Sequence, residues 1–135
     1  MKFIDLEGNQ HSREIDYKKH KRTELSRSKV ANLLYKKICE IFPNLEVLEE
    51  FPCVGLNPVL YVDFLILSPG VRIAFECDGV QHRKYVPFFH GSRANYARSK
   101  VNDISKERWL DINGIRIIRI ENEQDVENLL DKINE

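Results

Sequence analysis

Apolar residues recur at helical spacing in three parts of the chain. In residues 26–42 they return every three or four positions, which predicts an amphipathic helix that Pro43 ends. Residues 96–113 predict a second helix, closed by Gly114, and residues 123–133 predict a short third one. Each helix therefore has one apolar stripe to bury against another layer.

Between these helices the pattern changes to that of β-strands. Residues 45–51 alternate apolar and acidic side chains, residues 59–67 are apolar on both faces, and residues 71–77 and 115–120 supply two more core strands. The short turn at residues 68–70 predicts an antiparallel hairpin. The order helix, three strands, helix, strand, helix indicates an α/β domain with a mixed β-sheet flanked by helices.

The composition fits one small domain. The chain has 135 residues, of which 42% are hydrophobic, which is enough for one core and too short for two comfortable ones. We expect residues 23–135 to form a single domain, preceded by residues 1–22 as a polar, basic arm that is mobile or weakly structured. With no secretory leader, no membrane-spanning apolar run and no Cys-x-x-Cys pair, we expect a soluble cytoplasmic protein with reduced thiols.

Charge is spread unevenly although the formal net charge is zero. Residues 1–37 carry ten Lys or Arg and five Asp or Glu, and residues 79–102 carry five basic residues and no acid. Residues 121–135 carry six acids and a single lysine. The two basic segments suit a polyanionic partner, although charged runs also occur simply as solvated faces.

Three acidic residues lie in strands that are otherwise apolar. Asp63 is in the middle of one strand, and Glu76 and Asp78 are at the end of its neighbour, on one face. Buried carboxylates must be compensated, and a hairpin that brings Asp63 opposite Glu76 would create a site for a hard cation such as Mg²⁺ or Mn²⁺. The alternative is that the acids form ion pairs with arginines of the neighbouring strands, namely Arg72, Arg116 and Arg119.

Other polar residues are candidates for the same site. Gln81 and His82 follow the second acidic strand after a glycine and can turn back over the acids, so His82 is a candidate general base, or a structural histidine. Asp103 and Lys106 share a helix face with Leu110, which directs that face toward the core. The two either reach the sheet edge or form a surface ion pair of small worth.

The combined motifs resemble a known nuclease pattern. In chain order they are Asp63, then Glu76-x-Asp78-Gly79-x-x-His82, then Asp103-x-x-Lys106-x-x-x-Leu110, and Gly114 before the strand at 115–120. Over about residues 26–120 the chain resembles the PD-(D/E)xK nuclease superfamily. Within it, the similar branch holds the very-short-patch repair endonucleases, related phage homing endonucleases and small phage and bacterial proteins.

The resemblance implies a restriction-endonuclease-like core, a divalent metal and hydrolysis of DNA. It implies that Asp63 and Glu76 are the paired metal ligands, that Asp78 and His82 are active-site residues, and that Asp103 is a further acid in or beside the site.

Two positions depart from the family pattern. The usual lysine two residues after the second acid is Asp78 here, so the transition-state cation must come from elsewhere, with Lys106 as the first candidate. The glutamate that the first helix of the family often carries is replaced by Ala31, and Glu24 and Glu40 are imperfect substitutes for it.

We therefore expect a Mg²⁺- or Mn²⁺-dependent DNA endonuclease that acts as a homodimer or nicks one strand at a time. The candidate catalytic residues are Asp63, Glu76, Asp78, Gln81, His82, Asp103 and Lys106. The candidate phosphate contacts are Lys18, Lys19, Lys21, Arg22, Arg83, Lys84, Arg93, Arg98 and Lys100. The alternatives are a nucleic-acid-binding module of the same fold that has lost catalysis, and a structural protein whose acids are ion-paired.

Overall fold

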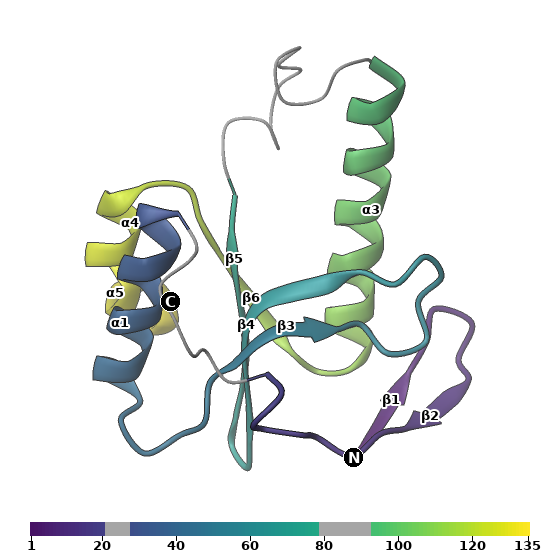
Figure 1. The fold of residues 1–135 in the computed structure, drawn as a ribbon, viewed down its shortest axis with the longest axis horizontal. Helices are drawn as coiled ribbons and strands as arrows, with labels where there is room; N and C mark the ends of the chain where they lie inside the picture. Colours follow the sequence, from purple (N-terminus) through teal and green to yellow (C-terminus); the bar gives the residue numbers. More distant parts are fainter. Residues whose placement is uncertain (21–27, 79–92) are drawn as a thin grey trace.

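A mixed four-stranded sheet lies between two layers (Figure 1). The computed structural model describes residues 1–20, 28–78 and 93–135. Its strand order is β3-β4-β5-β6, with β3 to β5 antiparallel and β6 parallel to β5. The strands are β3 (Leu48–Pro52), β4 (Tyr61–Ser68), β5 (Val71–Cys77) and β6 (Arg116–Ile120). This sheet, flanked by helices, confirms the expected α/β class and the predicted hairpin.

Three helices cover one face of the sheet (Figure 1). They are α1 (Lys29–Ile41), α4 (Glu123–Glu127) and α5 (Leu129–Ile133). The Ser28 hydroxyl caps α1 by accepting a hydrogen bond from the amide of Ala31 at 3.2 Å. Leu34 and Ile38 of α1 are buried in one cluster with Phe64 and Phe75 of the sheet. The single helix predicted over residues 123–133 is divided at Asn128 into α4 and α5.

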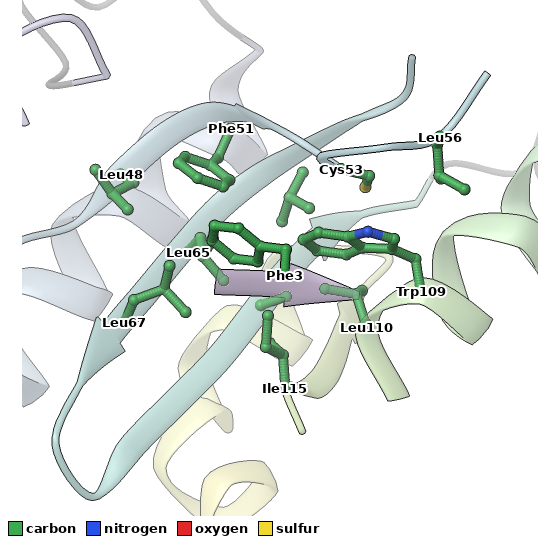
Figure 2. Packing of buried hydrophobic residues seen from close by; sticks show 12 residues of the cluster. Phe3, Leu48, Phe51, Cys53, Leu56, Leu65, Leu67, Trp109, Leu110 and Ile115 are labelled. Atoms are coloured by element: carbon green, nitrogen blue, oxygen red, sulfur yellow. The ribbon is translucent and has the colours of Figure 1, made fainter. Parts of the chain in front are cut away.

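The other face is covered by α3 (Arg93–Ile112) and by a hairpin of β1 (Lys2–Ile4) and β2 (Gln10–Ser12). Figure 2 shows Phe3 of β1 beside Trp109 of α3, and the two rings stack with centroids 5.5 Å apart. Phe3 is 0% exposed. The interpretation of residues 1–22 as a weakly structured arm is therefore wrong for the hairpin, because Phe3 belongs to the core; Lys21 and Arg22 lie outside the described residues.

Asn113, at the end of α3, fastens the hairpin to the helix. Its side-chain oxygen accepts a hydrogen bond from the amide of Ile4 at 2.8 Å, and its amide nitrogen donates to the carbonyls of Ile4 at 2.9 Å and Trp109 at 2.8 Å. This amide thus satisfies polar backbone groups at the buried end of β1. Gly114 follows with φ +67°, as predicted for a residue that ends a helix.

The connection between β3 and β4 is held by α3 and by the hairpin. The indole of Trp109 donates to the carbonyl of Val54 at 2.9 Å. On the other side, Gly55 lies so close to His11 that a Cβ atom there would be 2.7 Å from the imidazole Nε2. Both α3 and the hairpin therefore fix the path of this connection. None of the helices in the described ranges is long and apolar enough to cross a membrane.

Candidate active site

Asp63 and Glu76 face each other across neighbouring strands. The register pairs Phe64 of β4 with Phe75 of β5, so one step further along the two strands Asp63 stands opposite Glu76. The amide of Cys77 donates to Asp63 Oδ2 at 2.9 Å, which fixes the Asp63 side chain against the end of β5. The two carboxylates therefore converge, as the family resemblance requires of a metal-ligand pair.

Lys106 of α3 completes this group. Its Nζ lies 2.9 Å from Glu76 Oε1, and the Glu76 side chain is buried, with the residue 3% exposed. Trp109 and Leu110, both fully buried, anchor the next turn of α3 on the sheet and so hold Lys106 above the acids. We call Asp63, Glu76 and Lys106 the acid–lysine cluster.

The acid–lysine cluster contains two acidic side chains and only one basic side chain. Burial and the neighbouring Asp63 carboxylate raise the pKa of Glu76, and Lys106 opposes that shift only in part. Burial acts to lower the pKa of Lys106, but the Glu76 carboxylate outweighs it and raises that pKa. One lysine thus compensates two acids incompletely, so the protonated form of Glu76 is favoured, and a bound cation would instead favour its carboxylate.

Asp78 and Asp103 belong to a second group, around Arg119. Arg119 Nη1 lies 2.7 Å from Asp78 Oδ2 and 3.5 Å from Asp103 Oδ1, and Nη2 lies 2.6 Å from Glu107 Oε1. Burial works against the charged guanidinium, yet the hydrogen bonds that Arg119 donates to Asp78 and Glu107 raise its pKa. For Asp78 the ion pair with a neighbouring arginine, which the sequence left open, is therefore present. Asp103 pairs with Arg119 rather than with Lys106, which lies against Glu76.

Glu50 is a feature of this region that sequence reasoning missed. It has φ +52°, a left-handed conformation that non-glycine residues rarely adopt. The β3–β4 ladder pairs Glu49 with Phe64 and Phe51 with Val62, so Glu50 interrupts the ladder where it passes Asp63. Such outliers concentrate at functional sites. The sequence gives no signal for this conformation, because Glu49 and Glu50 look like ordinary residues of an alternating strand.

Cys53 lies beneath the acid–lysine cluster. Burial raises the pKa of its thiol to about 12, and the charges of Lys106 and Glu76 act on it in opposite directions. The thiol therefore stays protonated at neutral pH and is a packing group rather than a nucleophile.

The predicted phosphate contacts that are described lie on two elements. Lys18 and Lys19 are exposed after β2, in a turn whose amides donate to Asp16 Oδ1. Arg93, Arg98 and Lys100 are on the first turns of α3, which extend beyond the sheet alongside the end of β5 (Figure 1). The predicted residues Lys21, Arg22, Gln81, His82, Arg83 and Lys84 lie outside the described residues.

Neither Ala31 nor Glu40 of α1 takes the place of the glutamate that the family often carries on its first helix. Ala31 is buried in the core between α1 and the sheet. Glu40 is exposed and lies 3.8 Å from Lys37 of the same helix. Glu24 lies outside the described ranges.

The donor set in the described part of the chain suits a magnesium-like ion with few protein ligands. No group of three or more His, Cys, Asp or Glu side chains in that part could hold a metal ion. Mg²⁺, however, is usually bound through one or two carboxylates and keeps several waters, and it takes substrate phosphates as ligands. Asp63 and Glu76 are acids of this kind, and one lysine compensates them only in part, so they fit such an ion.

Comparison with known proteins gives one viral relative. The chain is 26% identical over 66 residues to "Uncharacterized protein 307L" of Invertebrate iridescent virus 6, which is 49% of this chain and 34% of the viral protein. The match thus spans about a third of the viral protein's length. No protein-family model matches the chain, and no solved structure matches it.

Proposed function

We propose that the protein is a metal-dependent DNA endonuclease with a restriction-endonuclease-like core, of the kind that its motifs resemble. The observation that carries the proposal is the acid–lysine cluster: a buried glutamate opposite an aspartate, with a lysine 2.9 Å from the glutamate. The cluster has two acids and one ammonium in a poorly hydrated setting, so the acids are incompletely compensated, which supports a role in binding a cation.

Asp63 and Glu76 would hold the Mg²⁺ or Mn²⁺ ion. When bound, the ion would polarise the phosphodiester and lower the pKa of an attacking water. Without the ion, Lys106 lies against the buried Glu76, and with a cation bound its ammonium would become available to the phosphoryl oxygens. In this way Lys106 would supply the charge that the family's usual lysine supplies.

The groups around the cluster support this role. Arg119 holds Asp78 and Asp103 and so fixes α3 against the end of the sheet beside the acids. Arg93 and Arg98, exposed on the first turns of the same helix, suit contacts with the phosphates that flank the scissile bond. His82, which lies outside the described residues, would accept the proton of the attacking water, as the sequence suggests.

The test is cleavage of plasmid, single-stranded and branched DNA with Mg²⁺, Mn²⁺ or EDTA. The near-isosteric variants Asp63→Asn and Glu76→Gln should lose cleavage by at least a hundredfold, because each removes a metal ligand without removing volume. Glu127→Gln and Asp131→Asn, exposed on α4 and α5, are matched controls that should cut like the parent protein.

A nucleic-acid-binding module without catalysis is the second candidate. Asp78, at the position of the usual lysine, is committed to Arg119, and this observation favours a site that has changed its role. That candidate predicts salt-sensitive DNA binding with no cleavage in any metal, and binding that Asp63→Asn leaves unchanged. Metal-dependent cutting that both site variants abolish would exclude it.

A further inference from the structure

A cavity of about 510 Å³ opens along the outer edge of β3. Residues 13–20 form one wall of it, and the connection between β3 and β4 forms the other. Its volume falls within the range of pockets that bind small ligands, roughly 300–1,000 Å³.

The walls of this cavity are fixed by contacts from three sides. Trp109 holds the backbone at Val54, and the close approach of Gly55 to His11 holds the next residue. On the opposite wall, the carbonyl of His20 accepts a hydrogen bond from the amide of Glu49 on β3. A pocket held in this way is formed before a ligand arrives, so binding needs little ordering of the protein.

His20 lines the cavity, and one of its ring nitrogens is buried without a partner in the described part of the chain. The residue is 6% exposed, and its Nδ1 lies 3.3 Å from the carbonyl oxygen of Glu49. Its Nε2 is buried and has no hydrogen-bond partner among the residues that the structure describes. Because a buried polar atom without a partner is costly, it marks a position where a ligand can contribute a hydrogen bond.

The other lining side chains suit the phosphate and the base of a nucleotide. Arg13 and Lys19 are cations that can neutralise a phosphate, and Arg13 is positioned with its guanidinium 5.8 Å from the centre of the Phe51 ring. Tyr61, 50% exposed, presents a ring on which a base can stack. The carboxylate of Glu49 is an acceptor for exocyclic amino groups, such as N4 of cytosine.

The cavity lies close to the candidate active site, because Cys53 lines it and the charges of Lys106 and Glu76 act on the Cys53 thiol. Tyr61, which lines the cavity, precedes Asp63 by two residues on β4. Glu50, which lines the cavity, interrupts the β3–β4 ladder beside Asp63. A nucleotide seated in the cavity would therefore bring its own phosphate, or the adjacent one, toward the acid–lysine cluster.

We infer that this cavity binds one unpaired nucleotide of the DNA substrate, next to the phosphodiester that is cut. The inference rests on the proposed function, and it specifies the substrate class as DNA with an extrahelical or single-stranded nucleotide. An acceptor-rich wall favours a base with an exocyclic amino group, such as cytosine, over thymine, which has none on its pairing edge.

The experiment compares binding, in EDTA, of a duplex with a single bulged cytosine, the same duplex with a bulged thymine, and the fully paired duplex. The parent protein should prefer the bulged cytosine. Tyr61→Ala should lose about fivefold to a hundredfold in affinity for it and little for the paired duplex, which is the usual effect of removing one stacking ring. Tyr61→Phe keeps the ring and should keep the preference. Tyr17→Ala changes a tyrosine of 41% exposure outside the cavity and is the matched control.

A second arm measures dCMP and dTMP binding by NMR, with thermal unfolding to show that each variant is folded. Equal binding of bulged and paired duplexes, or no effect of Tyr61→Ala, would overturn the inference, while metal-dependent cleavage would leave the proposed function standing. Binding of dCMP that Tyr61→Ala weakens, without cleavage of any DNA, would support the cavity and refute the nuclease. Absence of both DNA and dCMP binding would overturn both.

Discussion

Gly55→Ala should destabilise the protein strongly, because the β3–β4 connection touches the N-terminal hairpin at this residue. The new Cβ atom would lie 2.7 Å from His11 Nε2, 2.8 Å from His11 Cδ2 and 3.0 Å from Asp5 Cβ. The imidazole cannot move aside freely, since its Nε2 is bonded to Asp5 Oδ2 at 2.8 Å. The backbone φ of +92° adds strain of its own.

The magnitude follows from these two effects. A non-glycine residue in the left-handed region costs about 1–3 kcal/mol. Overpacking against a fixed group costs about another 1–3 kcal/mol. The expected loss in free energy of unfolding is therefore about 2–6 kcal/mol, a large part of the roughly 5–15 kcal/mol that keeps a domain folded.

Gly70→Ala separates the two effects. Gly70 has φ +83°, but nothing lies within 4 Å of its Cβ position, so this variant should show the backbone strain alone. Urea unfolding followed by circular dichroism measures both variants. Gly55→Ala should be less stable than Gly70→Ala by about 1–3 kcal/mol, and His11→Ala in the Gly55→Ala background should remove that excess. Equal losses in the two glycine variants would refute the contact between hairpin and connection.

Three further predictions concern the hairpin and the buried thiol. Phe3→Ala should lower the free energy of unfolding by about 3–5 kcal/mol in the same urea assay, because Phe3 is fully buried. A loss below about 1 kcal/mol would mean that Phe3 is not part of the core and that the N-terminal segment is a weakly structured arm. The hydrogen bond from His11 holds the pKa of Asp5 at about 2, below its usual 3.8, so its stabilising effect is complete above pH 4 and lost as the pH falls toward 2. Asp5→Asn should remove the loss of stability between about pH 4 and pH 2 from the acid denaturation curve. An unchanged curve would contradict the stabilising role of the Asp5 carboxylate. The Cys53 thiol, with a pKa of about 12, should resist Ellman's reagent in the native protein after the two half-buried cysteines have reacted, and rapid reaction of all three would show that it is accessible.

The site was only partly predictable from the sequence. Acids in apolar strands stand out because burying them is costly, and this signal selected Asp63, Glu76 and Asp78. Their partners depend on how α3 crosses the sheet. The crossing pairs Glu76 with Lys106 and leaves Asp78 to Arg119, and nothing in the local sequence of either strand distinguishes the two acids.

By itself the sequence determined the order of helices and strands after residue 26, the turn between β4 and β5 and the end of α3, because local spacing and turn residues control these features. Tertiary structure decided the rest. A three-residue strand such as β1 is too short to show a period. The burial of Phe3 depends on its contact with Trp109, and the neighbouring Ile4 is held by Asn113; both partners are more than a hundred positions away. The strand register and the docking of α3 likewise arise from packing between distant segments, and they bring Asp63, Glu76 and Lys106 into one site.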